Sequence, residues 1–328
     1  MISDSELKPK ISIILPVFNG AAFIADAINS VLIQTFNDFE LIIINDASYD
    51  KSKEIILSFK DSRIVYIENI TNLGQISSVN QGIKIAKANL VGRIDQDDVF
   101  LKEKLELQYE FFKKNKDIAV VGTWAAIINE DNNIKKYMSS PTSNNRMLNT
   151  LLNSNPLFHP SVVIRKDILL KMGLYSAEYE YTEDYYLWCR LVLSGYKIAN
   201  IPKYLLHYRE HHNQSSQENR TIQLENALKI RNLLFKKVFI DLQKNQKIIL
   251  KEFNSLELSD VSYTCSDIHG QRGDFKNSKT SLHLSIKYNW LNMKSYLMLF
   301  LLILNPFLNK KTVIKKNILR SKLLDSDI

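Results

Sequence analysis

The run FELIII, residues 39–44, is apolar apart from one glutamate, and a polar turn from Asn45 to Asp50 follows it. Such a run is typical of a strand that is buried on both faces, as in a parallel sheet. A similar strand and turn come earlier, with apolar residues from Ile11 to Leu15 and a turn from Pro16 to Gly20. Between the two strands, apolar residues recur at helical spacing from Ala21 to Gln34. The sequence therefore predicts a strand–helix–strand unit.

The same alternation continues through the first hundred residues and decides the fold class. Further strands are expected over Ile64–Glu68 and Leu90–Ile94, and further helices to about Phe59 and over Ile76–Lys87. This order predicts an α/β fold with a mostly parallel sheet, right-handed crossovers and flanking helices. Loops at the carboxyl ends of parallel strands gather into one crevice. The loops expected there are Pro16–Gly20, Asn45–Asp50, Asn69–Gly74 and Asp95–Asp98.

Three carboxylates follow the fourth expected strand, in the sequence RIDQDD at residues 93–98. Acids this close repel one another unless a cation joins them, and hard oxygen ligands suit magnesium or manganese. A solvated turn is the alternative, and Asp98 could instead cap the helix that is expected from Leu101. The chain has neither G-x-G-x-x-G after its first strand nor G-x-x-x-x-G-K-[ST]. A bound nucleotide would therefore need a cation in place of a glycine-rich turn.

The second half is expected to add a hairpin and several helices. These elements are a helix over Leu101–Lys114, paired strands over Ile118–Asn129 and Ile134–Met138, an extended stretch over Phe158–Lys166, and a helix from about Tyr181 to Gly195. Thr182 can cap that last helix, with Glu183 and Asp184 in its first turn. After a polar linker over Ser215–Asn219, helices dominate and include a hairpin around Gly270–Asp274.

The cysteines and the first residues favour a reducing compartment. Cys189 lies in an apolar helical run, where inert core packing is expected, and Cys265 shows no metal-ligand spacing with it. The first ten residues, MISDSELKPK, lack the apolar stretch of a secretory signal. We therefore expect a cytoplasmic protein, either free or peripheral on the inner face of the membrane.

The net charge of +8 is concentrated near the carboxyl end, with eight basic residues and no acid between Lys287 and Lys322. An apolar run from Tyr296 to Leu304 is too short to span a membrane, and Pro306 would end a helix there. The segment could anchor on anionic lipid, or it could be a core helix of a small helical domain. No nucleic-acid motif accompanies the charge, so no nucleic acid is expected as a partner.

Five segments resemble, in order and in approximate spacing, those of the inverting family 2 glycosyltransferases, which have the GT-A fold. The segments are Ser12–Asn19, Glu40–Asp50, Asn72–Gly74, Arg93–Asp98 and Thr182–Arg190. The resemblance implies a GT-A catalytic domain over residues 1–215, followed by a helical and basic region over 216–328. It also implies metal-dependent transfer of a sugar from a nucleoside-diphosphate sugar, which is UDP-linked by family habit.

The resemblance assigns the donor side to seven positions: Pro16, Val17, Asn19, Asp46, Asn72, Arg93 and Asp95. Asp46 matches the acid that reads the base or ribose, although the usual pair of aspartates is Asn45–Asp46 here. Asn72 belongs to the loop that closes over the nucleotide. Arg93 would be costly to bury alone, so it should pair either with Asp95 or with the ligand.

The expected ligands of Mn²⁺ or Mg²⁺ are Asp97, Asp95 and His211. His211 matches the histidine of a late family segment, here Tyr-Arg-Glu-His, that can reach the metal or the diphosphate. Arg209 in the same segment could neutralise phosphate charge.

The resemblance places the general base at Asp184, with Glu183 and His159 on the acceptor side. A helix amino terminus lowers the pKa of a carboxylate, so Asp184 is expected to be ionised at pH 7 and able to accept a proton. One displacement at the anomeric carbon inverts configuration, and no enzyme nucleophile is needed. Trp188 could stack on a sugar, although core packing is the favoured expectation.

Two other classes stay open. A nucleotidyltransferase can use a similar sheet and acid cluster, but the loop Pro16–Gly20 lacks the basic residues that it would want. A non-catalytic nucleotide-sugar-binding protein would be expected to lose some of the acids Asp46, Asp95, Asp97 and Asp184. The resemblance and the basic tail point to a saccharide or lipid-linked saccharide as acceptor, in surface polysaccharide or glycolipid assembly.

Overall fold

A computed structural model of the chain describes residues 8–212, 214, 219–244, 255–271, 275–288, 292 and 295. The chain divides into two compact units, Met1–Ile230 and Arg231–Ile328, so the division falls within helix α9 (Arg220–Lys244). Most of the expected polar linker and of the apolar and basic tail beyond Lys287 lies outside the described residues.

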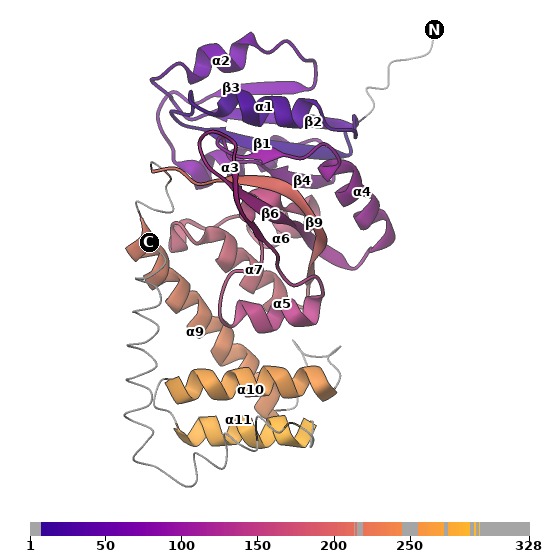
Figure 1. The fold of residues 1–328 in the computed structure, drawn as a ribbon, viewed down its shortest axis with the longest axis vertical. Helices are drawn as coiled ribbons and strands as arrows, with labels where there is room; N and C mark the ends of the chain where they lie inside the picture. Colours follow the sequence, from indigo (N-terminus) through magenta and orange to yellow (C-terminus); the bar gives the residue numbers. More distant parts are fainter. Residues whose placement is uncertain are drawn as a thin grey trace. The chain divides into compact units, whose positions relative to one another are not determined.

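The first unit begins with the expected alternation of strands and helices (Figure 1). Its elements are β1 (Ile11–Val17), α1 (Ile24–Leu32), β2 (Phe39–Asn45), α2 (Ser52–Ser58), β3 (Ile64–Glu68), α3 (Gln75–Ile85) and β4 (Leu90–Arg93). The four strands pair in parallel in the order β3-β2-β1-β4. The predicted α/β class is confirmed.

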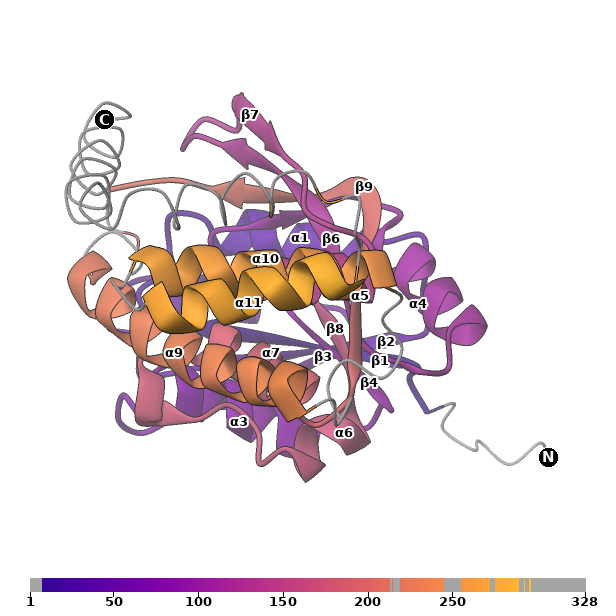
Figure 2. The same cartoon turned by 90° about the horizontal axis from the view of Figure 1, so that it is seen from below.

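Alternate residues of β1 face two different helical layers. Ile13 and Leu15 belong to the core that contains Ile28 of α1. On the other face, a Cβ at Gly82 of α3 would lie 2.6 Å from the Ile14 side chain, so the missing side chain lets this helix approach the sheet. Figure 2 shows α1 and α3 on opposite sides of the strands. Covering both faces leaves the carboxyl edge of β1–β4 as the accessible end.

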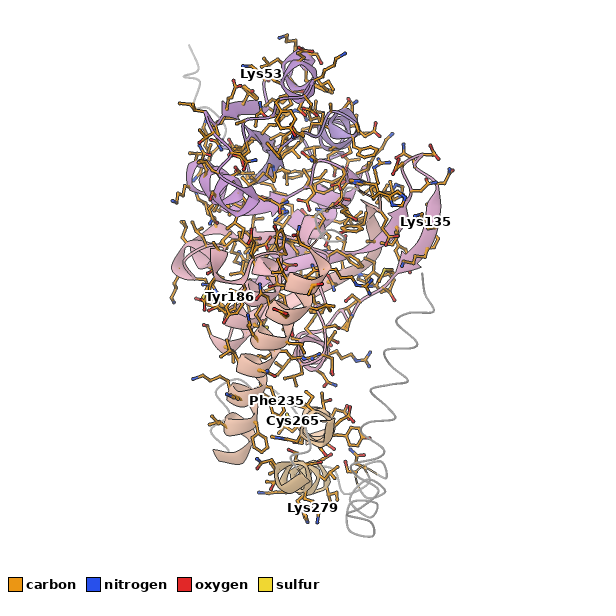
Figure 3. The ribbon with its side chains drawn as sticks, turned by 90° about the vertical axis from the view of Figure 1, so that its left-hand side faces the viewer. Lys53, Lys135, Tyr186, Phe235, Cys265 and Lys279 are labelled. Carbon is orange, nitrogen blue, oxygen red and sulfur yellow. The ribbon has the colours of Figure 1, made fainter. Side chains whose placement is uncertain are left out.

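The second half of this unit extends the same sheet. Its elements are β5 (Val99–Phe100), α4 (Lys104–Lys114), β6 (Ile118–Ile128), β7 (Ile134–Met138), α5 (Asn144–Leu151), η1 (His159–Ser161), β8 (Val163–Arg165), α6 (Lys166–Lys171), η2 (Ala177–Tyr179), α7 (Glu183–Leu193) and β9 (Lys197–Arg209). The strand order continues as β4-β8-β6-β9-β5, with β7 paired to β6 as the predicted hairpin. Lys135 marks that projecting hairpin in Figure 3.

Several local expectations were wrong. No element was predicted between Gly195 and Ser215, where the structure has the 13-residue strand β9, paired with both β6 and β5. The Thr182 hydroxyl donates to Tyr179 O and does not cap α7. Asp98 does not cap α4, which begins at Lys104; its carboxylate accepts from the Arg209 N–H.

The second unit contains the end of α9 together with α10 (Ser255–Gln271) and α11 (Phe275–Tyr288). The latter two form the expected hairpin. Serine hydroxyls join them, 3.0 Å apart in both Ser259–Ser285 and Ser266–Ser278. Phe235 of α9 and Cys265 of α10, labelled in Figure 3, are both buried. Of the helices that the structure describes, none combines the length and the apolar character needed to span a bilayer.

Candidate active site

The loop after β1 is held by side chains from two neighbouring loops and from the start of α2. The N–H groups of residues 18–21 donate, in order, to Gln96 Oε1 (2.9 Å), Ser48 Oγ (3.0 Å), Ser52 Oγ (2.8 Å) and Asp50 Oδ2 (2.9 Å). These four groups are therefore engaged and do not form a cradle for phosphate. Pro16 and Val17 are buried in β1, whereas Phe18 is 41% exposed and is the most exposed residue of this loop.

Asp46 anchors the next loop along the edge. Its Oδ1 accepts from Asn69 Nδ2 (2.7 Å) and Leu73 N (3.0 Å), and its Oδ2 accepts from Gly74 N (2.9 Å). The residue is 2% exposed. Asn72 lies in the same loop, exposed to solvent, and its Oδ1 also accepts from Gly74 N. A contact between Asp46 and a base would require this loop to release the carboxylate.

The side-chain amide of Asn45, where the family usually has an aspartate, is hydrogen-bonded at both ends. The amide donates from Nδ2 to the Tyr66 hydroxyl (3.1 Å) and accepts at Oδ1 from Ser48 N (3.2 Å). An ionised aspartate could accept but could not donate. Asn19, also expected on the donor side, accepts at Oδ1 from Tyr49 N (3.1 Å) and thereby ties the first loop to the second.

Arg93 links the two halves of the site. Its guanidinium lies 2.6 Å from Asp95 Oδ1 and 3.7 Å from Glu183 Oε1, and its Nη1 lies 3.1 Å from His159 Nδ1. The arginine side chain is only 5% exposed. Since a buried unpaired charge is costly, the two acids compensate the guanidinium, as expected for Asp95. The donor-side strand β4 is thus joined to the start of α7.

Asp97 and His211 are the two expected metal ligands that the structure brings side by side. Asp97 Oδ2 lies 2.9 Å from His211 Nε2, and both side chains are 14% exposed. Asp95 Oδ1 is occupied by Arg93. Within the described part of the chain, no three His, Cys, Asp or Glu residues form a group that could hold a metal ion by themselves. Of the Asp97–His211 pair, Asp97 has the chemistry of a Mg²⁺ or Mn²⁺ ligand, since such ions are commonly bound through one or two carboxylates together with substrate phosphates.

Arg209 does not have the expected role at a phosphate. It is fully buried, and its guanidinium donates to three backbone carbonyls, those of Asp97 (2.8 Å), Asn129 (3.1 Å) and Glu130 (3.0 Å). Its backbone N–H donates to Asp98, whose pKa is raised well above its usual value by burial and by the neighbouring acids. Arg209 therefore stabilises the acidic loop through hydrogen bonds to Asp97 O and the Asp98 carboxylate.

Glu183, Asp184 and His159 lie together, but they differ in burial. The side chains are 8%, 15% and 11% exposed, so Asp184 is the most accessible of the three. Burial, and then the charge of Asp184, raises the pKa of Glu183 to about 7. Burial, and then the charge of Arg93, holds the pKa of His159 well below its usual value, so its ring is neutral at pH 7. Glu183 faces Arg93 and His159 and has little surface left for an acceptor.

The expected direction of the net pKa shift of Asp184 was wrong. Burial raises the pKa of Asp184 above its usual value, and hydrogen bonds from Tyr185 N (2.6 Å) and Asn155 Nδ2 (2.7 Å) oppose that rise. Sequence reasoning missed both Asn155 and Gln96. A lone asparagine before a proline indicates only a turn, and Gln96 was read only as the residue between two acids.

Two further expectations concern the core. Trp188 is fully buried, so it packs in the core, as favoured. Cys189 is 2% exposed, and burial raises the pKa of its thiol, as expected for an inert core cysteine.

Residues 12–173 match the family model described as Glycosyl transferase family 2. The chain is 31% identical over 207 residues to an uncharacterized glycosyltransferase of Methanocaldococcus jannaschii, which covers 62% of this chain and 71% of that protein. It is 33% identical over 214 residues to the O-antigen biosynthesis glycosyltransferase WbnJ of Escherichia coli, and the match covers 64% of this chain and 82% of that protein. It is 30% identical over 182 residues to the Escherichia coli UDP-Glc:alpha-D-GlcNAc-diphosphoundecaprenol beta-1,3-glucosyltransferase WfgD. This match covers 56% of this chain and 69% of that protein.

Among solved structures, S. aureus TarS residues 1–349 in complex with UDP superposes with a TM-score of 0.55 at 17% identity, covering 83% of this chain and 90% of that one. The complex of the same protein with UDP-GlcNAc gives a TM-score of 0.55 at 18% identity, with the same coverage. At these identities the likeness shows a shared GT-A fold.

Proposed function

Because the chain belongs to glycosyltransferase family 2 and is a glycosyltransferase, we propose that it moves a sugar, with inversion, from a nucleoside-diphosphate donor to a saccharide hydroxyl. The contacts of Arg93 carry the proposal. This one guanidinium contacts Asp95, which follows the donor-side strand, and Glu183, the neighbour of the acid Asp184. The arrangement supports a site at which a donor and an acceptor hydroxyl meet.

The leaving diphosphate is the charge that the donor side has to stabilise. Asp97 and His211 would hold Mn²⁺ or Mg²⁺, and the bound ion would supply positive charge opposite the diphosphate. The engaged N–H groups of residues 18–21 support this assignment, since that loop offers no backbone cradle of the kind found in P-loop proteins. Arg209 keeps the backbone of the acidic loop in place beneath these two side chains.

Asp184 acts on the acceptor side. As the acceptor oxygen forms its bond to the anomeric carbon, Asp184 takes the hydroxyl proton and the bond from that carbon to the diphosphate oxygen breaks. One displacement inverts the configuration, so no enzyme nucleophile takes part. Its exposed fraction of 15%, against 8% for Glu183, supports Asp184 as the acid that meets the acceptor.

The relatives suggest the substrates. TarS binds UDP and UDP-GlcNAc, and WbnJ acts in O-antigen biosynthesis. The name of WfgD specifies UDP-Glc as the donor and a diphosphoundecaprenol-linked GlcNAc as the acceptor. We propose a UDP-linked donor and a saccharide or lipid-linked saccharide acceptor, in the assembly of a surface polysaccharide or glycolipid. The basic segment 287–322 would hold the chain at the anionic inner membrane surface where such an acceptor lies.

The test is a transfer assay with UDP-Glc, UDP-Gal and UDP-GlcNAc and a diphosphate-linked saccharide acceptor, with Mn²⁺ or with chelator. Asp184→Asn should abolish transfer and keep the thermal shift that UDP with Mn²⁺ produces. The matched control is Asp167→Asn, since this exposed aspartate also occupies the second position of a helix. Nearly full transfer by Asp184→Asn would overturn the base assignment. Pyrophosphate release from a nucleoside triphosphate and a sugar phosphate would favour a nucleotidyltransferase.

A further inference from the structure

Asn155 lies in the turn between α5 and η1 and makes two hydrogen bonds through its side-chain amide. Its Oδ1 accepts from Leu157 N (3.1 Å), and its Nδ2 donates to Asp184 Oδ2 (2.7 Å). The first bond fixes the orientation of the amide. A backbone N–H can only donate, so the oxygen must face Leu157 and the NH₂ group must face Asp184.

The turn that carries Asn155 is held in place from two directions. On one side, the carbonyl oxygen of Pro156 accepts from Ser140 Oγ (2.5 Å) and from Asn200 Nδ2 of β9 (3.1 Å). On the other side, the Tyr185 hydroxyl of α7 donates to the Leu151 carbonyl. The amide therefore has a position relative to α7 that the surrounding fold determines.

The bond from Asn155 reaches the carboxylate whose ionisation the proposed reaction needs. The carboxylate of Asp184 accepts from the Asn155 side chain at Oδ2 and from Tyr185 N at Oδ1, and its own backbone N–H also favours the ionised form. Asp184 Oδ1 takes the backbone bond, so Asn155 holds the second oxygen. Two N–H donors to one carboxylate favour its ionised form and fix its plane.

Other charged and titratable groups face this carboxylate from the surrounding elements: Glu183 on α7, His159 on η1, Arg93 on β4, Tyr175 before η2 and Cys189 on α7. Of these, Arg93 favours the ionised form and Glu183 disfavours it. Neither of them bonds the oxygen that Asn155 holds.

We propose that Asn155 is a positioning residue for the general base, keeping the carboxylate of Asp184 ionised and aimed at the acceptor hydroxyl. The inference rests on the proposed function of Asp184 and adds a residue from a different element to it. Asn155 touches neither substrate in this scheme and acts through the acid alone.

The test compares Asn155→Ala and Asn155→Asp with Asn153→Ala, an exposed asparagine two residues earlier in the same turn. We expect kcat of Asn155→Ala to fall by about ten- to a hundredfold, as for a displaced catalytic group. In the pH profile of kcat/KM, the acidic limb should move to higher pH by about one unit. This is the shift that the loss of one hydrogen bond to a charged group produces. KM for the donor should stay unchanged. Asn155→Asp, close in shape, should shift the limb further, since a second carboxylate replaces the donor.

The outcomes separate this inference from the proposed function. An Asn155→Ala enzyme with an unmoved acidic limb, or with the behaviour of Asn153→Ala, would overturn the positioning role while wild-type transfer stands. Wild-type chain that transfers no sugar from any UDP donor would overturn the proposed function itself. If Asn155→Ala does not fold, Asn155→Asp gives the same decision through its pH profile.

Discussion

Asp97 and His211 are separated by 114 positions in the chain, yet their side chains lie 2.9 Å apart. Asp97 follows β4 in the acidic loop, and His211 follows the last residue of β9. Arg209, two residues before His211, couples the two segments, since its guanidinium donates to the Asp97 carbonyl. The pair is thus a product of the sheet, in which β9 lies beside β5 and β6.

His211→Ala should weaken the binding of divalent cations at the site. Removing one of the two proposed ligands, and the partner that orients the other, should raise the Mn²⁺ concentration for half-maximal activity by about 10- to 100-fold. Manganese titrations of transfer and of the UDP-dependent thermal shift measure the effect. His212→Ala is the matched control, because His212 is the exposed neighbour. Equal Mn²⁺ requirements in the two variants would contradict a ligand role for His211.

Arg93→Gln should destabilise the first unit strongly. The substitution leaves the buried Glu183 and the 21% exposed side chain of Asp95 without their counter-charge, and breaking such pairs costs up to about 3–5 kcal/mol. Urea unfolding at pH 7 measures the loss. Lys53→Gln breaks an exposed pair with Glu68 and should cost far less, because solvent screens that pair. A loss for Arg93→Gln as small as that of Lys53→Gln would show that the guanidinium is not essential to the fold.

Glu183 should make the stability of the folded chain fall as the pH rises toward neutrality. Its pKa is raised from 4.5 to about 7, mainly by burial. The folded state therefore retains a proton that the unfolded state releases, so the stabilisation is complete below about pH 4.5 and is lost as the pH passes 7. Glu183→Gln, which cannot ionise, should remove this dependence. Between pH 5 and 8, wild type should lose about 2 kcal/mol relative to the variant. Parallel pH dependences in urea unfolding would contradict the raised pKa.

Gln108 should be needed for stability more than for activity. From the middle of α4, its Nε2 donates to Val121 O (3.0 Å) and Ser161 O (2.9 Å), and its Oε1 accepts from the buried Lys104 (2.9 Å). Gln108→Leu should cost at least about 2 kcal/mol, because buried polar groups on three elements lose their partner. Lys114→Leu, on the exposed side of the same helix, should change stability by less than about 0.5 kcal/mol. A Gln108→Leu protein as stable as that control would show that water replaces the amide.

The first four strands could be predicted because each is an apolar run closed by a polar turn, which is a local property of the chain. Strand β9 could not, since Pro202 and Lys203 break its pattern and its stability comes from β5 and β6. The same limit applies to the site. The acids were visible as motifs, but the partners of Arg93 and the donor to Asp184 depend on where η1 and α7 pack.

The sign error for Asp184 has the same origin. A helix amino terminus is a local feature and lowers the pKa of a carboxylate, whereas burial is a tertiary feature and raises it. In this fold α7 begins inside the unit, with Glu183 6% exposed, and burial outweighs the helix terminus. The family motif located the residue, but only the packed structure could tell which influence is larger.

The loop of residues 18–21 has a thermodynamic consequence. Its four N–H groups are held by side chains from two other loops and from the first residue of α2, so its backbone conformation is set during folding. Ordering a backbone costs about 1–2 kcal/mol per residue. A ligand that docks here meets a surface that is already rigid and does not have to supply that entropy. If the proposed nucleotide donor docks at this loop, its selection is therefore a matter of fit to a fixed shape, in which Phe18 is the most exposed residue.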